Sequence, residues 1–221
     1  MAKVLVIGGA GYIGSHVVKA LLQKGHQATV YDNLSTGQKV NLFEKAEFVE
    51  GDILDSGRLF DTMRGGFDAV VHLAAKKAVG ESMENPDKYS INNIQGALNI
   101  LMAMSASGIR HIVFSSSAAV YGMPEYLPVD EKHPVNPINY YGFTKLEIER
   151  FMEWYDRLKG MRYVALRYFN AVGYDAAGDI RGKERNPQNL LPIIIEAASG
   201  VRFTLQANGR TQQTLVPGYE D

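Results

Sequence analysis

The chain has 221 residues, of which 46% are hydrophobic and 21% charged, and its formal net charge is −1. This composition is typical of a soluble globular protein with one large domain, or one domain and part of another. A balanced charge argues against nucleic-acid binding, and the absence of cysteine excludes disulfides, thiolate metal ligands and a thiol nucleophile. No stretch has the pattern of a signal sequence or a membrane span, so we expect a cytoplasmic protein without a membrane partner.

The first predicted strand, Lys3–Ile7, runs into a glycine-rich turn that opens a predicted helix, Tyr12–Lys24. The glycines of the turn are Gly8, Gly9, Gly11 and Gly14. Glycine lets a pyrophosphate approach the main chain, and the N–H groups at a helix N-terminus attract negative charge. The next predicted strand, Gln27–Tyr31, ends at Asp32, near the spacing of an acid that binds ribose. Together, the glycine turn and the acid after the second strand favour a dinucleotide-binding site over a purely structural turn.

Asp32 also indicates which dinucleotide binds. Its carboxylate can accept hydrogen bonds from the ribose hydroxyls of NAD and would repel the 2′-phosphate of NADP. No arginine follows closely that could hold such a phosphate. We therefore expect NAD as the cofactor.

Further β-branched runs alternate with helical patterns along the chain. Strands are predicted at Glu47–Glu50, Ala69–Leu73, His111–Ser115 and Arg162–Arg167, and helices at Gly57–Arg64, Pro86–Ser107, Tyr140–Lys159 and Leu190–Ala198. The alternation predicts an α/β fold with a doubly wound parallel sheet, the Rossmann fold. Right-handed crossovers bring the carboxyl ends of the strands to one edge, where such folds bind ligands. We expect an NAD-binding domain over 1–167 and a partial substrate-binding region over 168–221.

A second chemical signal lies in the predicted helix Tyr140–Lys159. Tyr141 and Lys145 are four residues apart and share a helix face. An ammonium, together with the positive nicotinamide ring of an oxidised cofactor, lowers the pKa of a tyrosine hydroxyl. Such a pair can take a proton from a substrate hydroxyl while hydride leaves the same carbon. The alternative is an exposed contact between an aromatic ring and a lysine.

A serine run, Ser115–Ser117, follows the strand that begins at His111. We expect one of these serines to lie beside Tyr141 and the others to be structural or to contact the cofactor. Lys77, after the fourth strand, could reach the ribose or phosphate of the cofactor. No His and acid residues have the spacing of a metal site, so no metal is expected.

Nine segments of the chain resemble the extended short-chain dehydrogenase/reductase family, and within it the UDP-sugar 4-epimerases. They are residues 8–16, 31–35, 51–53, 77–82, 92–96, 114–118, 141–145, 166–170 and 189–192. The resemblance implies that Tyr141 is the base, Ser117 its partner, and Lys145 a ribose-binding lysine that lowers the pKa of Tyr141. It implies an NAD site made of Gly8, Gly11, Tyr12, Ile13, Gly14, Asp32, Asn33, Asp52, Ile53, Lys77, Asn93, Ser115, Tyr141, Lys145 and Tyr168. It implies that Ser117, Asn170, Asn189 and Leu190 touch the UDP-sugar.

The reaction implied by the resemblance is the interconversion of UDP-galactose and UDP-glucose through transient oxidation at C4, in a homodimer formed by a helix pair. Ala118 and Ala119 stand where the dehydratases of the family carry Asp–Glu, which disfavours loss of water. An NAD-binding fragment or sensor without turnover remains an alternative. Another UDP-sugar epimerase or a reductase of the same family is a further one.

Family members are longer, and the resemblance is expected to end at about residue 205. From about residue 206 the sequence is polar, without a sustained period. We expect a C-terminally truncated member whose tail comes from a shifted frame or an early stop, or a natural short form. The cofactor domain should still fold and bind NAD.

Overall fold

The structure is a computed structural model that describes residues 1–182, 190–200, 204–207 and 210–213. Its contacts divide the chain into two compact units, Met1–Lys183 and Glu184–Asp221. None of the described helices is both long and apolar enough to cross a bilayer.

The first unit is built on a six-stranded parallel sheet with the order β3-β2-β1-β4-β5-β6. The strands are β1 (Lys3–Ile7), β2 (Gln27–Asp32), β3 (Glu47–Glu50), β4 (Ala69–His72), β5 (His111–Ser117) and β6 (Arg162–Tyr168). This topology confirms the predicted doubly wound sheet. The direction of winding reverses between β1 and β4, and the carboxyl ends of the strands around this point form the usual ligand edge.

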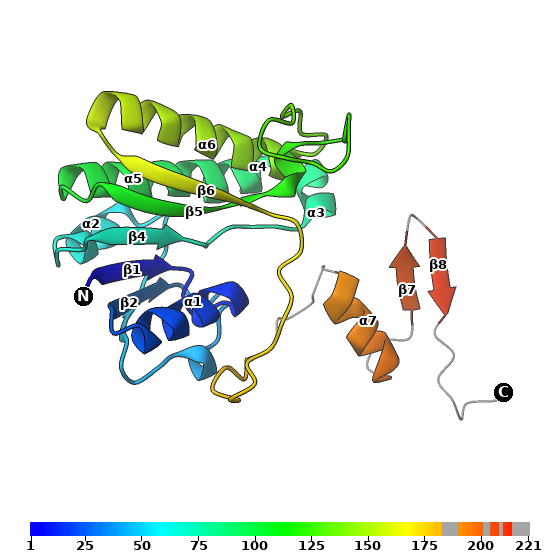
Figure 1. Cartoon of the computed structure of the whole chain (residues 1–221), viewed down its shortest axis with the longest axis horizontal. Coiled ribbons are helices and arrows are strands. Elements are labelled where there is room, and N and C mark those ends of the chain that lie inside the picture. The colour runs from blue at the N-terminus through cyan, green and yellow to red at the C-terminus, as the bar shows by residue number, and fades with distance from the viewer. Residues whose placement is uncertain (183–189, 201–203, 208–209, 214–221) are drawn as a thin grey trace. The chain divides into compact units, whose positions relative to one another are not determined.

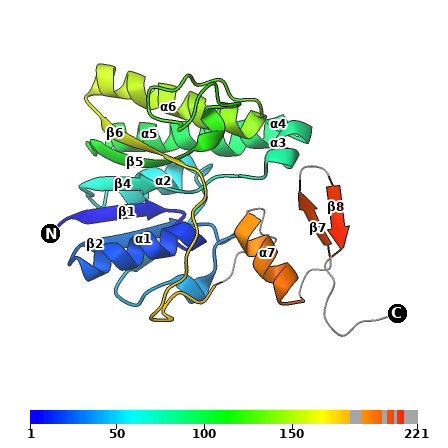
Figure 2. The ribbon, with the colours of Figure 1, turned by 45° about the vertical axis from the view of Figure 1, so that its right-hand side comes forward.

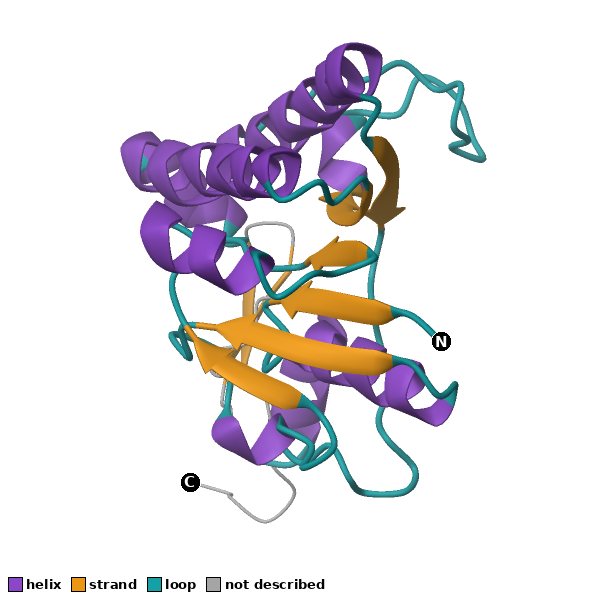
Figure 3. Ribbon diagram, turned by 90° about the vertical axis from the view of Figure 1, so that its left-hand side faces the viewer, coloured by secondary structure: helices purple, strands orange, loops and turns teal. Residues whose placement is uncertain are grey.

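Helices cover both faces of the sheet (Figures 1 and 3). Helix α1 (Tyr12–Gln23) lies against β1 and β2, whereas α2 (Ser56–Met63), α5 (Gly96–Ala106) and α6 (Tyr140–Lys159) lie on the other face (Figure 2). The central strand β1 is buried on both faces, since Leu5 and Ile7 belong to one core cluster and Val6 to the other. Its unbroken apolar run is the pattern of such a strand.

The connection from β4 to β5 differs from the single helix predicted at Pro86–Ser107. It contains α3 (Val79–Glu84), which was not predicted, then α4 (Pro86–Tyr89), a π-helical turn η2 (Ser90–Gln95) and α5. Pro86 separates α3 from α4 because proline fits the first turn of a helix but not its interior. The wider turn η2 holds Asn93, which is 1% exposed. Short 3-10 turns occur at η1 (Lys39–Asn41) and η3 (Ala118–Val120).

Beta strand β5 extends two residues beyond its predicted end, because its ladder with β6 continues to the pair Ser117–Tyr168. The serine run therefore lies within β5, and its side chains alternate between the two faces of the sheet. Ser116 is buried, while Ser115 and Ser117 are half-buried.

The second unit contains α7 (Leu190–Ala198), as predicted, and an antiparallel pair of strands, β7 (Thr204–Ala207) and β8 (Arg210–Gln213). Strand β8 lies in the polar segment that has no sustained period, so the sequence did not indicate it. The predicted ligand Asn189 lies outside the described residues, as does the side chain of Leu190.

Candidate functional site

The glycine turn after β1 is a close-packed backbone cradle. Gly8 has φ +85°, and a Cβ on it would lie 2.7 Å from the backbone nitrogen of Ala74. A Cβ on Gly14 would collide with the carbonyl oxygen of Gly8, so α1 can start this close to β1 only with glycine there. Gly11 precedes α1 as its N-cap residue and uses no side chain to cap it. The first N–H groups of α1 therefore have no side-chain cap at this end.

Asp32 is fixed at the end of β2 beside this cradle. Its Oδ2 accepts a hydrogen bond from the Ala10 N–H at 3.0 Å, and its Oδ1 accepts one from the Leu34 N–H at 2.8 Å. Burial raises the pKa of the carboxyl, and these two bonds oppose the rise. Each carboxylate oxygen keeps a further lone pair that could accept a bond from a diol.

Three other residues of the predicted NAD site join the ends of β2 and β3. The Asn33 amide donates to Asp52 Oδ2 at 2.7 Å, and Asp52 Oδ1 accepts from the Leu54 N–H. Ile53 is buried against Gly96 of α5, where a Cβ would overlap its side chain. Asp52 and Asn33 thus form one polar cluster next to Asp32. Ile53, which follows Asp52, packs its apolar side chain against α5.

Tyr141 and Ser117 meet where α6 begins. The Ser117 side chain interacts with the Tyr141 hydroxyl and favours a lower pKa of that hydroxyl. The start of α6 is held by the Asn139 side chain, which accepts from the Gly142 N–H, and by Ser82, which accepts from the Tyr141 N–H at 3.1 Å. A Cβ on Gly142 would lie 2.5 Å from the Ala119 carbonyl oxygen, so glycine lets α6 approach the turn that follows β5.

Lys145 lies one helical turn below Tyr141 and is 2% exposed. Its Nζ donates to the Ser115 carbonyl at 2.7 Å and lies 5.8 Å from the centre of the Tyr141 ring. Burial lowers the pKa of Lys145 to about 7, and the charge of Glu149 opposes this fall. In the predicted Tyr–Lys pair, Lys145 is therefore buried and Tyr141 half-buried, so the pair is not an exposed contact.

The predicted fall in the pKa of Tyr141 is not found in the protein by itself. Burial raises the pKa of this hydroxyl, and the interaction with Ser117 only partly opposes the rise. The prediction combined the charge of Lys145 with that of an oxidised nicotinamide, so it stays a prediction for the protein with its cofactor bound.

Asn93 and Lys77 lie beside the end of β4. The Asn93 amide donates to the Lys76 carbonyl at 3.0 Å and to Thr144 Oγ1 at 3.2 Å, and its oxygen accepts from the Lys76 N–H at 2.8 Å. Asn93 therefore ties the turn after β4 to helix α6. Lys77 itself is exposed.

An ion pair between the half-buried Arg167 and the buried Glu149, which the sequence analysis did not find, lies behind Lys145. Arg167 of β6 binds the Glu149 carboxylate through two nitrogens, with Nη2 2.7 Å from Oε2 and Nε 3.1 Å from Oε1. The Ser116 hydroxyl also donates to Oε1. The spacing 141, 145, 149 continues the same helix face, and this signal could have identified Glu149.

The segment after β6 runs along α1. Tyr168 ends β6 half-buried, and Asn170 is exposed. The Tyr12 hydroxyl donates to the Gly173 carbonyl at 2.6 Å, and Lys19 of α1 forms an ion pair with Asp175 at 2.5 Å. These bonds join residues 168–182 to the first unit, and the contact boundary falls after residue 183.

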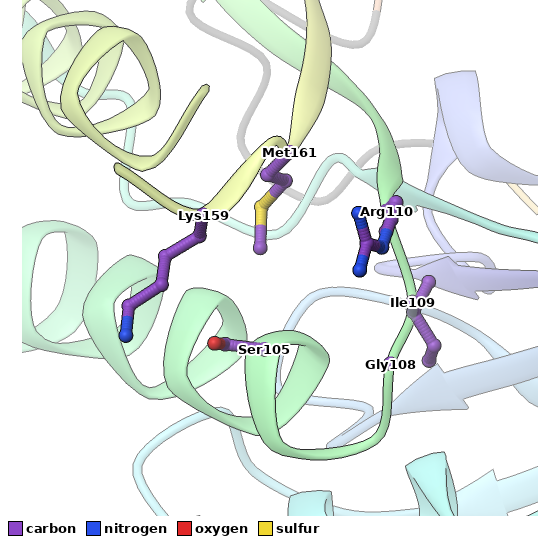
Figure 4. A pocket seen from close by; sticks show the side chains of 6 residues that line it. All are labelled: Ser105, Gly108, Ile109, Arg110, Lys159 and Met161. Atoms are coloured by element: carbon purple, nitrogen blue, oxygen red, sulfur yellow. The ribbon is translucent and has the colours of Figure 1, made fainter. Parts of the chain in front are cut away.

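A small pocket occurs at the opposite edge of the sheet, where β5 and β6 begin. It is lined by Ser105, Gly108, Ile109, Arg110, Lys159 and Met161 (Figure 4). The carboxyl ends of α5 and α6 lie there, and their partial negative charge offsets the two exposed basic residues. Among the described residues, no three His, Asp or Glu side chains gather as a metal site would require.

The fold and this edge define a class of protein. A doubly wound sheet, a glycine cradle and an acid after β2 are features of dinucleotide-binding proteins, and here a half-buried tyrosine above a buried lysine lies at the same edge. The chain belongs to the NAD dependent epimerase/dehydratase family, whose model matches residues 4–216. The match extends past about residue 205, where the resemblance was expected to end.

Similar proteins carry the name UDP-glucose 4-epimerase. The protein from Lactobacillus helveticus is 46% identical over 198 residues, which are 89% of this chain and 60% of the relative. The one from Streptococcus mutans is 44% identical over 215 residues, 96% of this chain and 64% of the relative. The chain thus spans less than two thirds of the length of these relatives.

The chain is also similar to solved structures of proteins named UDP-glucose 4-epimerase. The UDP-glucose 4-epimerase from Brucella ovis in complex with NAD has a TM-score of 0.90 and 46% identity, covering 93% of this chain and 63% of that one. The enzyme from Bifidobacterium longum in complex with NAD+ and UDP has a TM-score of 0.84 and 35% identity, covering 90% and 62%.

Proposed function

We propose that this chain carries the cofactor half and the acid–base groups of a UDP-sugar 4-epimerase, which interconverts UDP-galactose and UDP-glucose. The observation that carries the proposal is the half-buried Tyr141, whose hydroxyl interacts with Ser117 and whose ring centre lies 5.8 Å from Lys145 Nζ. The names of its relatives support the choice of substrate.

The edge fits NAD. The glycine cradle has no room for a Cβ on Gly14, and the α1 N-terminus that it opens suits a pyrophosphate. The Asp32 carboxylate, held by two backbone N–H groups, would bind the ribose diol. Lys145 would contact the second ribose, while Tyr168 would lie near the nicotinamide. Bound NAD would accept a hydride from the sugar and later return it.

Tyr141 acts as the base in the proposed reaction. It takes the proton of the sugar 4-hydroxyl, while the Ser117 hydroxyl forms a hydrogen bond to the same sugar oxygen. The hydride of C4 would pass to the cofactor at the same time, so that C4 becomes a ketone. After the sugar turns over, the hydride returns to the opposite face and Tyr141 gives the proton back to O4. The positive charge of oxidised nicotinamide would lower the pKa of Tyr141, against the rise that burial causes.

Substrate contacts in this proposal come from Ser117 and from Asn170, Asn189 and Leu190. A homodimer belongs to the same proposal. Met102 of α5 is 59% exposed, and Trp154 and Leu158 of α6 are 55% and 71% exposed. Apolar side chains of this size on neighbouring helices are a suitable dimer surface. Light scattering should give twice the chain mass, and Trp154→Glu should give a monomer. A wild-type monomer would refute this part.

The test of the proposed function is turnover of UDP-galactose to UDP-glucose by the purified chain, without added NAD. We expect product from the wild type and a loss of at least about 100-fold in Tyr141→Phe, because the base is removed. Tyr140→Phe is the matched control, since that neighbour bonds Ser90 and not Ser117. A folded chain that retains NAD but forms no product would instead be a cofactor-binding module.

A further inference from the structure

We propose that Glu149 is a positioning residue for the Tyr141–Lys145 pair: its carboxylate, clamped by Arg167 and Ser116, favours the ammonium form of the Lys145 side chain. The catalytic meaning of this role rests on the proposed function. The role itself concerns the charge of Lys145 and can be measured without turnover.

The first argument is the placement of Glu149 on α6. Tyr141, Lys145 and Glu149 follow one another at intervals of four residues, so they form a single row on the face of α6 that packs on the sheet. Lys145 is 2% exposed and Glu149 is 8% exposed. Water therefore screens their interaction much less than it would at the surface.

The second argument is that the carboxylate is held on both oxygens. Arg167 contacts both, and Ser116 donates to one of them. Ser116 and Arg167 are paired residues of the β5–β6 ladder, so both partners come from one position of the rigid sheet. A two-point arginine contact of this kind fixes the orientation of a carboxylate and favours its charged form. Glu149 therefore presents a fixed negative charge to Lys145.

The third argument concerns the other groups around Lys145. His72 of β4 faces it, but burial lowers the pKa of this histidine to about 3, so it carries no charge at neutral pH. The Ser115 carbonyl accepts the bond from Nζ, and the Phe114 ring lies 4.7 Å from that atom. These groups leave Glu149 as the charge that opposes the effect of burial on the pKa of Lys145.

The protonation state of Lys145 depends on two opposing effects, because burial lowers its pKa and the charge of Glu149 raises it. Burial brings the pKa of this residue to about 7, so a modest loss of negative charge nearby would leave it neutral at working pH. A neutral lysine would no longer favour the Tyr141 phenolate. Glu149 thus acts on Tyr141 through Lys145, without touching the substrate.

The experiment is a pH titration of the full chain labelled with ¹³C-lysine and followed by NMR, with the Lys145 signal assigned by its loss in Lys145→Met. In Glu149→Gln we expect the titration midpoint of Lys145 to fall by about one pH unit. Glu149→Asp should largely restore it. Ser116→Ala, which removes a hydrogen bond but keeps the carboxylate, is the matched control and should leave the midpoint close to that of the wild type.

Glu149→Gln leaves the half-buried Arg167 without its partner, which can prevent folding. The double variant Glu149→Gln/Arg167→Leu removes both charges, and because the lost Arg167 cation had opposed the effect of Glu149, a smaller downward shift is expected in it. An unchanged midpoint in whichever of the two variants folds would overturn the proposal. If the wild type shows no epimerase activity, the proposed function fails, yet the midpoint still decides the role of Glu149.

Turnover gives a second readout where activity is present. The alkaline limb of the kcat profile should move to lower pH by about one unit in Glu149→Gln, with the KM for UDP-galactose little changed. A uniform loss of rate with the limb in its original place would mean that Glu149 only supports the fold.

Discussion

Single residues at the carboxyl edge serve two purposes, and Asp32 is the clearest case. One carboxylate oxygen accepts a hydrogen bond from the Ala10 N–H in the glycine turn, and the other accepts one from the Leu34 N–H. Both oxygens can still accept further hydrogen bonds. The charge that would select NAD is thus also a part of the local structure.

Replacing Asp32 with asparagine should weaken NAD binding about tenfold, because a charge-assisted hydrogen bond to the ribose is lost. Binding of NADP should weaken less or improve, since the repulsion of its 2′-phosphate disappears. Fluorescence titrations with both dinucleotides measure the two affinities. Asp61→Asn, at an exposed position of α2, is the charge-matched control. Equal losses for NAD and NADP would contradict a role in selection.

Lys145 links function to stability. Its pKa is about 7 in the folded protein and 10.5 in the absence of burial, so folding penalises the charged form. This cost is fully present below pH 7. The cost disappears as the pH rises from about 7 to about 10.5. Between these two values the unfolded chain still binds the proton that the folded chain has lost, so the free energy of unfolding increases with pH.

Lys145→Met should therefore stabilise the fold by about 2 kcal/mol at about pH 6, after allowance for the lost bond to the Ser115 carbonyl. The advantage should shrink by about pH 9.5. Urea unfolding at the two pH values measures it, and activity should be lost at both. A variant less stable than the wild type at pH 6 would mean that the bond to Ser115 outweighs the cost of burial.

At the scale of elements, the contact between β1 and α1 depends on the absence of side chains in the turn. Gly14→Ala should lower the free energy of unfolding by about 1–3 kcal/mol, because its methyl group would strike the Gly8 carbonyl. Calorimetry and NAD titration should show lower stability and weaker binding together.

The control is Gly57→Ala in α2, where a Cβ would make only ordinary contact, 3.6 Å from Asp55 Oδ1. This variant should be neutral or more stable by up to about 1 kcal/mol. If Gly14→Ala behaved like Gly57→Ala, the turn would not be as close-packed as the structure indicates.

At the scale of the whole molecule, the first unit contains the complete sheet, both core clusters and every described residue of the proposed NAD site. The loop after β6 closes this unit, since the Gly182 N–H donates to the Asn41 side chain at 2.7 Å.

A chain that ends after residue 183 should therefore fold cooperatively and bind NAD with the affinity of the 221-residue chain. Thermal unfolding and NAD titration of the two chains provide the comparison. We expect this outcome because the contacts of residues 1–183 gather within one compact unit. Aggregation or a clear loss of NAD affinity in the shorter chain would show that residues 184–221 support the first unit.

The sequence predicted local features well, because these features depend on neighbours along the chain. Strand β1, the start of α1, the whole of α6 and the parallel sheet were all expected from periodicity. The break of the long helix into α4, η2 and α5 was missed, since a π-helical turn leaves the same apolar pattern as an α-helix over a few residues. Helix α3 was missed because it is only six residues long.

The sequence by itself determined which chemical groups this protein has and at what spacing: the glycine turn, Asp32, and the pair Tyr141 and Lys145. Only the tertiary structure decided their electrostatics. The Glu149–Arg167 pair joins α6 to β6 across eighteen positions of the chain, and Asn93 ties η2 to the turn after β4. Burial by such distant segments lowers the pKa of Lys145 and raises that of Tyr141 in the chain without its cofactor, and local spacing carries no information on this burial.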